Sequence, residues 1–97
     1  MDVAPTEQYA VHPSVICREL GGETVLLNLV SGIYYGLDAV GTRVWQLLVE
    51  GRTIAGMCEA MLEEYDVAPD VLHDDVVRLV GELRDRGIVT PRAPVQA

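Results

Sequence analysis

The stretch that decides the fold is Ser31-Gly32-Ile33-Tyr34-Tyr35-Gly36-Leu37-Asp38-Ala39-Val40-Gly41-Thr42-Arg43-Val44-Trp45. It predicts, in this order, a turn, a short strand with two adjacent tyrosines, an aspartate that caps a helix, and the start of an amphipathic helix. The spacing of the apolar residues changes within it from about 2 to about 3.6 residues. We therefore expect the last strand of a sheet to lie here, at the sheet edge and beside a helix.

Turn signals divide the preceding chain into three strands. Gly-Gly at 21–22 and Ser-Gly at 31–32 separate runs rich in β-branched and aliphatic residues over 15–20, 24–30 and 33–37. Such an arrangement predicts an antiparallel meander.

Side chains alternate between the two faces of each strand. In the middle strand Val25, Leu27 and Leu29 share a fully apolar face, whereas Leu26 and Asn28 share a face that is only partly apolar. We expect helices to cover one side of this sheet.

Three amphipathic helices are predicted after the strands. Asp38 and Thr53 are N-caps of the first and second helix, and Gly51 lies just past the end of the first. Pro69 begins the third helix and Gly87 ends it. The expected core stripes are, for the first helix, Val40, Val44, Leu47 and Leu48; for the second, Ile54, Met57, Cys58, Met61, Leu62 and Tyr65; and for the third, Leu72, Val76, Leu79 and Leu83, with Val80 beside them.

The fold class that follows is α+β, a three-stranded antiparallel β-meander followed by three α-helices that cover one face. We expect residues 1–9 to form a flexible N-terminus, residues 10–89 to form a single domain, and residues 90–97, with two prolines, to form a disordered tail.

Charge and cysteine content limit the compartment and the partners. The chain has 15 acidic and 7 basic side chains, a formal net charge of −8 that disfavours nucleic acid and anionic membrane surfaces. No targeting segment and no apolar run near the ~20 residues of a membrane span is recognised. We expect Cys17 and Cys58 to be buried free thiols, and the protein to be cytoplasmic.

No cluster of residues in the sequence favours catalysis, a metal or a cofactor. His12 precedes a proline near the N-terminus, and His73 is followed directly by Asp74 and Asp75 rather than by ligands at i, i+4 spacing. The glycines form no phosphate-binding motif. We therefore predict a protein that is not an enzyme and that needs no cofactor and no metal.

The third strand is instead a candidate binding edge. It has one neighbour in a meander, and it contains neither the lysine nor the proline that blunts many edges. Ile33, Tyr35 and Leu37 share its inner face, whereas Tyr34 has no evident place in a core. A peptide added antiparallel would gain backbone hydrogen bonds. The alternative is that both tyrosines only cover the core and that a loop hides the edge.

Backbone pairing alone would not hold such a peptide. Each hydrogen bond contributes about 0.5–1.5 kcal/mol, whereas ordering each residue costs roughly 1–2 kcal/mol. Apolar anchors that contribute about 1.5–3 kcal/mol each are therefore required. We expect a cleft between this strand and the third helix. Its apolar floor would be formed by Leu37, Val76, Val77 and Val80, and its polar rim by Asp75, Arg78 and Arg84.

The ordered succession of these signals resembles a known family. The residues that carry the resemblance are Gly22-Glu23-Thr24-Val25-Leu26-Leu27, Gly32 to Asp38, Gly41, Val44-Trp45, Leu47-Leu48, Gly51, Thr53-Ile54, Asp75-Val76, Leu83 and Gly87-Ile88-Val89. They are similar to the pattern of the pyrroloquinoline quinone biosynthesis protein D family over about residues 10–89. Asp38 stands where the family usually has asparagine, and both residues cap helices.

The resemblance implies a winged helix-turn-helix-like fold that binds a leader peptide. Domains of this type are called RiPP recognition elements, after the ribosomally synthesised and post-translationally modified peptides whose leaders they bind, and stand-alone versions serve lasso-peptide pathways. The implied partners are a precursor leader and a modifying enzyme, here a leader peptidase. The implied binding residues are Ile33, Tyr34, Tyr35, Gly36 and Leu37, with Asp75, Val76, Arg78 and Leu79 or their neighbours Val77 and Val80.

The sequence is compatible with two other functions. A winged-helix DNA-binding regulator shares the fold, but its third helix would bring Asp70, Asp74, Asp75, Glu82 and Asp85 toward phosphates. A structural subunit that contacts only another protein would bind no leader at all.

Overall fold

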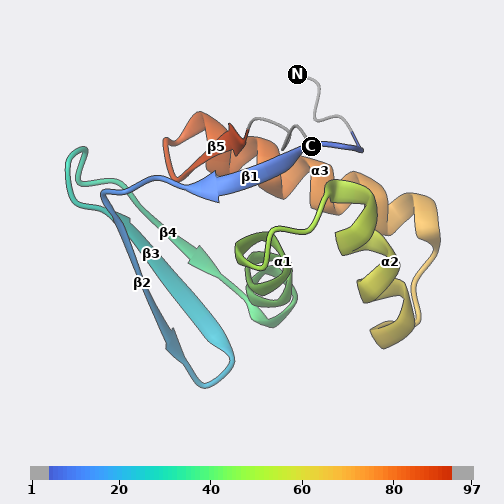
Figure 1. Cartoon of the computed structure of the whole chain (residues 1–97). Helices are drawn as coiled ribbons and strands as arrows, with labels where there is room; N and C mark the ends of the chain where they lie inside the picture. The colour runs from blue at the N-terminus through green and yellow to red at the C-terminus, as the bar shows by residue number, and fades with distance from the viewer. Residues whose placement is uncertain (1–4, 93–97) are drawn as a thin grey trace.

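The computed structural model describes residues 5–92, which form two sheets and three helices (Figure 1). In chain order the elements are β1 (Gln8–Val11), β2 (Val15–Leu20), β3 (Glu23–Asn28), β4 (Tyr34–Leu37), α1 (Ala39–Val49), α2 (Ile54–Glu64), α3 (Pro69–Asp85) and β5 (Val89–Arg92). The predicted α+β class, with a meander followed by three helices, is confirmed. No helix in the described part of the chain is long and apolar enough to cross a membrane.

The main sheet is antiparallel, with the strand order β2-β3-β4. Gly21 and Gly22 join β2 to β3 with φ values of 61° and 84°. A two-residue hairpin turn with positive φ at both positions matches the twist of its strands, and glycine adopts it without steric cost. The hairpin therefore forms where the sequence predicts it.

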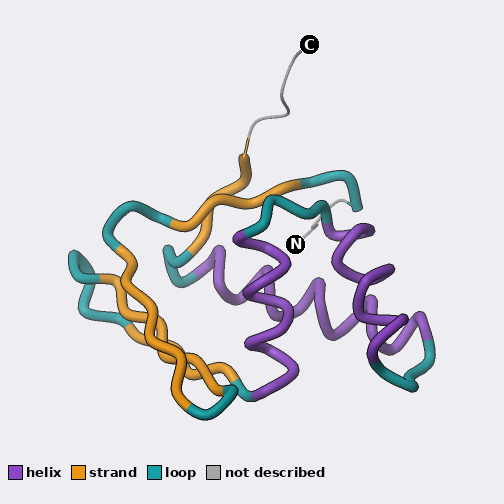
Figure 2. Tube along the Cα trace, turned by 60° about the horizontal axis from the view of Figure 1, so that its bottom comes forward, coloured by secondary structure: helices purple, strands orange, loops and turns teal. Residues whose placement is uncertain are grey.

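The helices cover the partly polar face of this sheet (Figures 1 and 2). Thr24, Leu26 and Asn28 are buried, whereas Val25 and Leu29 of the fully apolar face are exposed. Burial of the polar groups is tolerated because each has a partner. The Thr24 and Thr42 hydroxyls share a hydrogen bond of 2.9 Å, and Asn28 Nδ2 donates to the Gly87 carbonyl at 3.1 Å.

The predicted helix ends are confirmed. Asp38 Oδ1 accepts from the Gly41 N–H at 2.8 Å, and Thr53 Oγ1 accepts from the Gly56 N–H at 3.0 Å. At the end of α3 the Ile88 N–H donates to the carbonyl of Leu83, five residues earlier, at 2.9 Å. This is the 6→1 hydrogen bond of a Schellman motif.

The core lies between the three helices and the inner face of the sheet. On α3 the buried residues are Leu72, Val76, Val80 and Leu83. The prediction that Leu79 belongs to this stripe, with Val80 only beside it, is therefore wrong: Leu79 is half-buried and Val80 is fully buried. Val40 was likewise expected in the core of α1 but is exposed.

A second, two-stranded sheet joins the ends of the described chain. β1 and β5 pair antiparallel, with Tyr9 opposite Pro91 and Val11 opposite Val89. Tyr9, expected in a flexible N-terminus, and Thr90, expected in a disordered tail, both lie in strands. The ribbon forms because Tyr9 and Val89 are buried against the helices. The rest of the expected flexible ends, residues 1–4 and 93–97, lies outside the described residues.

Both cysteines are free, and they lie in different environments. Cys58 is buried in α2, as predicted, and burial raises the pKa of its thiol. Cys17 is exposed, contrary to the prediction. It is opposite Leu26 on the helical side of the sheet, but it lines a hollow of about 330 Å³ between β2 and α1, because α1 does not fully cover this outer strand.

Candidate peptide-binding site

The β4 strand leaves one edge of the sheet open. β3 is its one neighbour within residues 5–92. The Asn28 N–H donates to the Ile33 carbonyl at 2.9 Å, which makes these two residues a hydrogen-bonded pair. Since such pairs alternate along an antiparallel ladder, Tyr35 and Leu37 bond to β3, while the N–H and C=O groups of Tyr34 and Gly36 point to the open edge.

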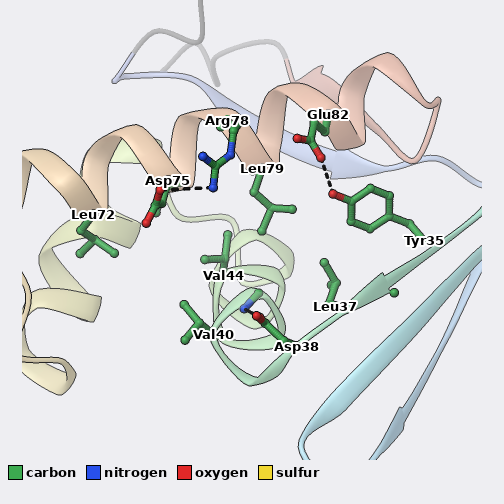
Figure 3. Close-up of a pocket in the computed structure, with 13 residues that line it drawn as sticks. Tyr35, Leu37, Asp38, Val40, Val44, Leu72, Asp75, Arg78, Leu79 and Glu82 are labelled. Atoms are coloured by element: carbon green, nitrogen blue, oxygen red, sulfur yellow. Dashed lines mark hydrogen bonds and ion pairs between the residues drawn. The ribbon is translucent and has the colours of Figure 1, made fainter.

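A cavity of about 530 Å³ lies beside this edge (Figure 3). It is framed by β4, the first turns of α1 and one flank of α3. Its volume falls within the ~300–1,000 Å³ range of ligand sites. The lining residues are Tyr35, Gly36, Leu37, Asp38, Val40, Gly41, Val44, Leu72, Asp75, Val76, Arg78, Leu79 and Glu82.

The floor of the cavity is apolar. Leu37, Val44 and Val76 are buried side chains of the core that also line the cavity. Leu79 projects into it from α3 above, and Val40 borders it on α1 below (Figure 3). An aliphatic side chain that entered from the β4 edge would therefore meet aliphatic groups from two helices and one strand.

The corner between β4 and α1 holds the strand close to the helix. Gly41 makes this approach possible: a Cβ there would lie 3.3 Å from Asp38 Oδ1 and 3.3 Å from Leu37 Cδ2, closer than most real contacts. The Asp38 cap bonds to the same residue. The width of the cavity on this side is thus set by a capping hydrogen bond and by the absence of a side chain.

The rim of the cavity is polar and includes a bridge between β4 and α3. The Tyr35 hydroxyl donates to the Glu82 carboxylate, and the Arg86 guanidinium lies 5.1 Å from the centre of the Tyr35 ring. The hydrogen bond to Glu82 and burial raise the pKa of Tyr35. Further along α3, Arg78 Nη2 pairs with Asp75 Oδ1 at 3.3 Å.

The structure brings together most of the predicted site residues. Tyr35, Gly36, Leu37, Asp75, Val76, Arg78 and Leu79 all line the cavity. It does not bring four others to it. Ile33 precedes β4 and Tyr34 faces the opposite side of the sheet, although both belong to the edge segment. Val80 is in the core, and Val77 packs against the core outside the cavity.

The predicted floor and rim were therefore only partly right. Val77 and Val80 do not form the floor, and Arg84 does not line the cavity but pairs with Asp85 at 3.6 Å. The residues that sequence reasoning missed are Asp38, Val40, Gly41, Val44, Leu72 and Glu82. Helical spacing could have identified several of them. Positions 40 and 44 on α1, and positions 72, 75, 79 and 82 on α3, are three or four residues apart and so lie on the same side of their helix.

The residues considered for catalysis do not converge on this cavity. His12 Nδ1 accepts from the Ser14 N–H at 3.1 Å, and His73 is exposed with its Nδ1 3.8 Å from Asp74 Oδ1. Within residues 5–92 no group of three or more histidine, cysteine, aspartate or glutamate side chains is placed to hold a metal ion.

The fold and the cavity define a class of small α+β domain that offers an extended peptide an open strand edge above an apolar floor. This chain belongs to the PqqD family. The family model described as coenzyme PQQ synthesis protein D (PqqD) matches residues 23–89. The resemblance identified from the sequence is thereby confirmed.

Two solved structures are similar to this chain along most of its length. One is TbiB1 in complex with the TbiA(beta) leader peptide, with 32% sequence identity, a TM-score of 0.79, and coverage of 87% of this chain and 98% of that chain. The other is a lasso peptide synthetase B1 complexed with the leader peptide, with 25% identity, a TM-score of 0.79, and coverage of 87% and 99% respectively. No significant match is found among curated protein sequences.

Proposed function

We propose that this chain is a RiPP recognition element without catalytic activity, which binds the leader of a ribosomally made precursor peptide as an added strand on β4. It then presents the precursor to a modifying enzyme, a lasso-peptide leader peptidase. The observation that carries this proposal is the open edge of β4 beside the apolar cavity. The two relatives that were solved with leader peptides support it.

The backbone of the leader would pair with Tyr34 and Gly36. Their outward N–H and C=O groups offer about four hydrogen bonds at roughly 0.5–1.5 kcal/mol each. Ordering about five leader residues costs roughly 1–2 kcal/mol per residue. Pairing and ordering therefore nearly cancel, and the affinity depends on the side chains of the leader that enter the cavity.

Alternate side chains of the added strand point toward the helices. Two of them would reach the floor formed by Leu37, Val76 and Leu79. Each buried aliphatic side chain contributes about 1.5–3 kcal/mol. We therefore propose a leader motif with apolar residues at positions i and i+2.

A DNA-binding role is disfavoured by charge. Asp70, Asp74, Asp75, Glu82 and Asp85 lie on α3 together with Arg78 and Arg84, and the whole chain carries a formal charge of −8. A recognition helix of this composition would repel the phosphate backbone. The free state of both cysteines agrees with the cytoplasmic location that we propose.

The test is a titration of the ¹⁵N-labelled domain with synthetic leaders of lasso-peptide precursors, including the TbiA(beta) leader that is bound in the relative of 32% identity. We expect saturable binding and slower hydrogen exchange of the Tyr34 and Gly36 amides, because these groups become paired. The buried amides of Val44 and Leu47 in α1 serve as internal controls whose exchange should not change. A structural subunit would show no saturable binding. Binding without protection of the β4 amides would contradict strand addition.

A further inference from the structure

The open edge of β4 extends past the cavity. The hydrogen bond between Tyr35 and Glu82 lies at one end of the cavity, and Asp75 lies toward the other end (Figure 3). Arg86, the C-cap residue of α3, follows one helical turn after Glu82. Ile33 precedes Tyr35 by two residues and so lies on the same face of the sheet. Neither Arg86 nor Ile33 lines the cavity, so they form a separate area beyond the Tyr35–Glu82 bridge.

The end of α3 is held against the start of β4. The Asn28 N–H donates to the Ile33 carbonyl at 2.9 Å, and Asn28 Nδ2 donates to the Gly87 carbonyl at 3.1 Å. The Arg86 guanidinium lies 5.1 Å from the centre of the Tyr35 ring. Ile33 keeps 39% of its exposure, and Arg86 is exposed. An accessible apolar side chain and an accessible cation therefore lie at the same end of the open edge.

Arg86 differs from its neighbouring arginines in having no carboxylate partner. Arg78 pairs with Asp75 at 3.3 Å, and Arg84 pairs with Asp85 at 3.6 Å. Among residues 5–92 no ion pair joins Arg86 to a carboxylate. A guanidinium over an aromatic ring still presents its N–H donors, which lie in its own plane, to an incoming carboxylate.

An added antiparallel strand would bring one leader side chain to this area. Leader residues opposite Leu37, Tyr35 and Ile33 point toward the helices, because side chains alternate along a strand. The residues opposite Leu37 and Tyr35 are the two apolar residues proposed for positions i and i+2. The next inward residue, at position i+4, is opposite Ile33 and lies on the C-terminal side of the motif. It therefore meets Arg86 rather than the floor of the cavity.

We infer that Arg86 is a specificity-determining residue, which selects leaders with an aspartate or glutamate at position i+4. The inference rests on the proposed function. The carboxylate would form charge-assisted hydrogen bonds with the guanidinium, and its methylene groups would cover Ile33. The chain as a whole carries a formal charge of −8 and disfavours acidic peptides. Position i+4 is thus the place where an acidic residue would improve binding.

Arg86 also has a structural role that the experiment must separate from this one. It lies at the C-terminal end of α3, where a cation interacts favourably with the helix dipole. That role depends on the domain alone. It predicts a change in stability but no dependence on the charge of the leader, so the experiment compares leaders that differ only in charge.

The probe is the TbiA(beta) leader, which is bound in the relative of 32% identity, or whichever lasso-peptide leader the wild-type domain binds more tightly. Each position in turn is replaced by Glu, Gln and Lys. Calorimetry gives the Kd of every peptide for the wild type, Arg86→Gln and Arg86→Glu. The control is Arg18→Glu, which changes the formal charge of the domain as much as Arg86→Glu does. Arg18 is exposed on β2, the strand of the main sheet farthest from β4.

The scan identifies the register by itself. All three replacements should weaken binding at positions i and i+2, because each places a polar group in the apolar cavity. Two residues after the second of these positions, the wild type should bind the Glu peptide roughly three- to tenfold more tightly than the Lys peptide. The Gln peptide, which has the shape of Glu without its charge, should have an intermediate Kd. This preference should shrink as the ionic strength rises, because the pair is exposed.

The variants test whether Arg86 causes this preference. Arg86→Gln should abolish it, and Arg86→Glu should reverse it in favour of Lys, whereas Arg18→Glu should retain it. Arg86→Gln should bind the Gln peptide with a Kd within about twofold of the wild-type value, which also shows that the variant is folded.

Four outcomes would overturn the inference. The wild type might show no position with a preference for Glu, or the preference might persist in both Arg86 variants. An equal loss of the preference in Arg18→Glu would assign it to net charge. Lower thermal stability of the Arg86 variants with an unchanged ratio of the Glu and Lys values of Kd would leave Arg86 with its helix-end role alone. Failure of every leader to bind the wild type would instead contradict the proposed function.

Discussion

Replacing Gly36 by proline tests whether a peptide pairs with β4. Gly36 is opposite Val25 in a pair whose backbone groups point away from each other, so that its N–H faces the open edge. Proline removes this donor, and an edge position with an outward N–H is where a sheet tolerates proline. The ladder between β3 and β4 therefore stays intact while an incoming strand loses one hydrogen bond.

The size of the effect follows from that lost donor. A hydrogen bond contributes roughly 0.5–1.5 kcal/mol net, but removing its donor alone leaves a buried leader carbonyl without a partner, and the whole loss is then about 1–3 kcal/mol. Since about 1.4 kcal/mol corresponds to tenfold in Kd, we expect Gly36→Pro to raise the Kd of the leader roughly 5- to 150-fold. Fluorescence anisotropy with a labelled leader measures this change.

Gly36→Ala is the matched control. A Cβ at this position meets nothing within 4 Å, and alanine keeps the outward N–H. We expect its Kd to lie within about twofold of the wild-type value, and thermal unfolding should show both variants folded. If folded Gly36→Pro binds the leader as tightly as Gly36→Ala, the leader does not pair with β4 at this position and the reasoning is refuted.

Further predictions concern the cavity, the cysteines and Tyr35. Leu79→Asp should raise the Kd of the leader roughly tenfold or more in calorimetric titrations, because it places a charge in the apolar cavity. The control is Val77→Asp, since Val77 is on the same helix, half-buried and outside the cavity, and this variant should leave the Kd of the leader unchanged. An equal loss of leader affinity in both variants would contradict the site. Native alkylation with iodoacetamide, followed by mass spectrometry, should modify exposed Cys17 and spare buried Cys58; prior labelling of Cys58 would contradict the packing. The raised pKa of Tyr35 means that its hydroxyl stabilises the fold below the ordinary tyrosine pKa of about 10 and that this stabilisation is lost as the pH rises through the higher folded value. The free energy of unfolding of the wild type relative to Tyr35→Phe, from urea denaturation, should therefore fall above about pH 10; a difference that does not change with pH would exclude this role of the hydroxyl.

The parts of the fold that the sequence predicts are those set by local chemistry. Asp38 and Thr53 cap their helices through their own side chains, and Gly87 has a φ of 73° that ends α3. Each signal acts within a few residues, so it is readable without knowledge of the rest of the chain. The alternation that separates Tyr34 from Tyr35 is likewise local, and it is confirmed.

The errors occur where distant parts of the chain decide. β1 and β5 pair only because the two ends of the domain meet, with the His12 N–H donating to the Ile88 carbonyl at 2.9 Å. The sequence leaves open which sheet face is buried, because that depends on partners far along the chain, such as Thr42 for Thr24 and Gly87 for Asn28. Hydropathy alone favours burial of the opposite, fully apolar face, because it does not take these hydrogen bonds into account.

The candidate site shows the same division between local and distant causes. Leu79 and Val80 are adjacent, and in a helix with about 3.6 residues per turn they point about 100° apart. Either could have lined the cavity. The docking of α3 on the other helices buries Val80. The Tyr35–Glu82 hydrogen bond joins β4 to the flank of α3 that faces away from Val80. The rotation of α3 about its axis therefore determines which side chains a bound strand meets, so a change in the packing of Val80 would alter leader selection without touching the leader.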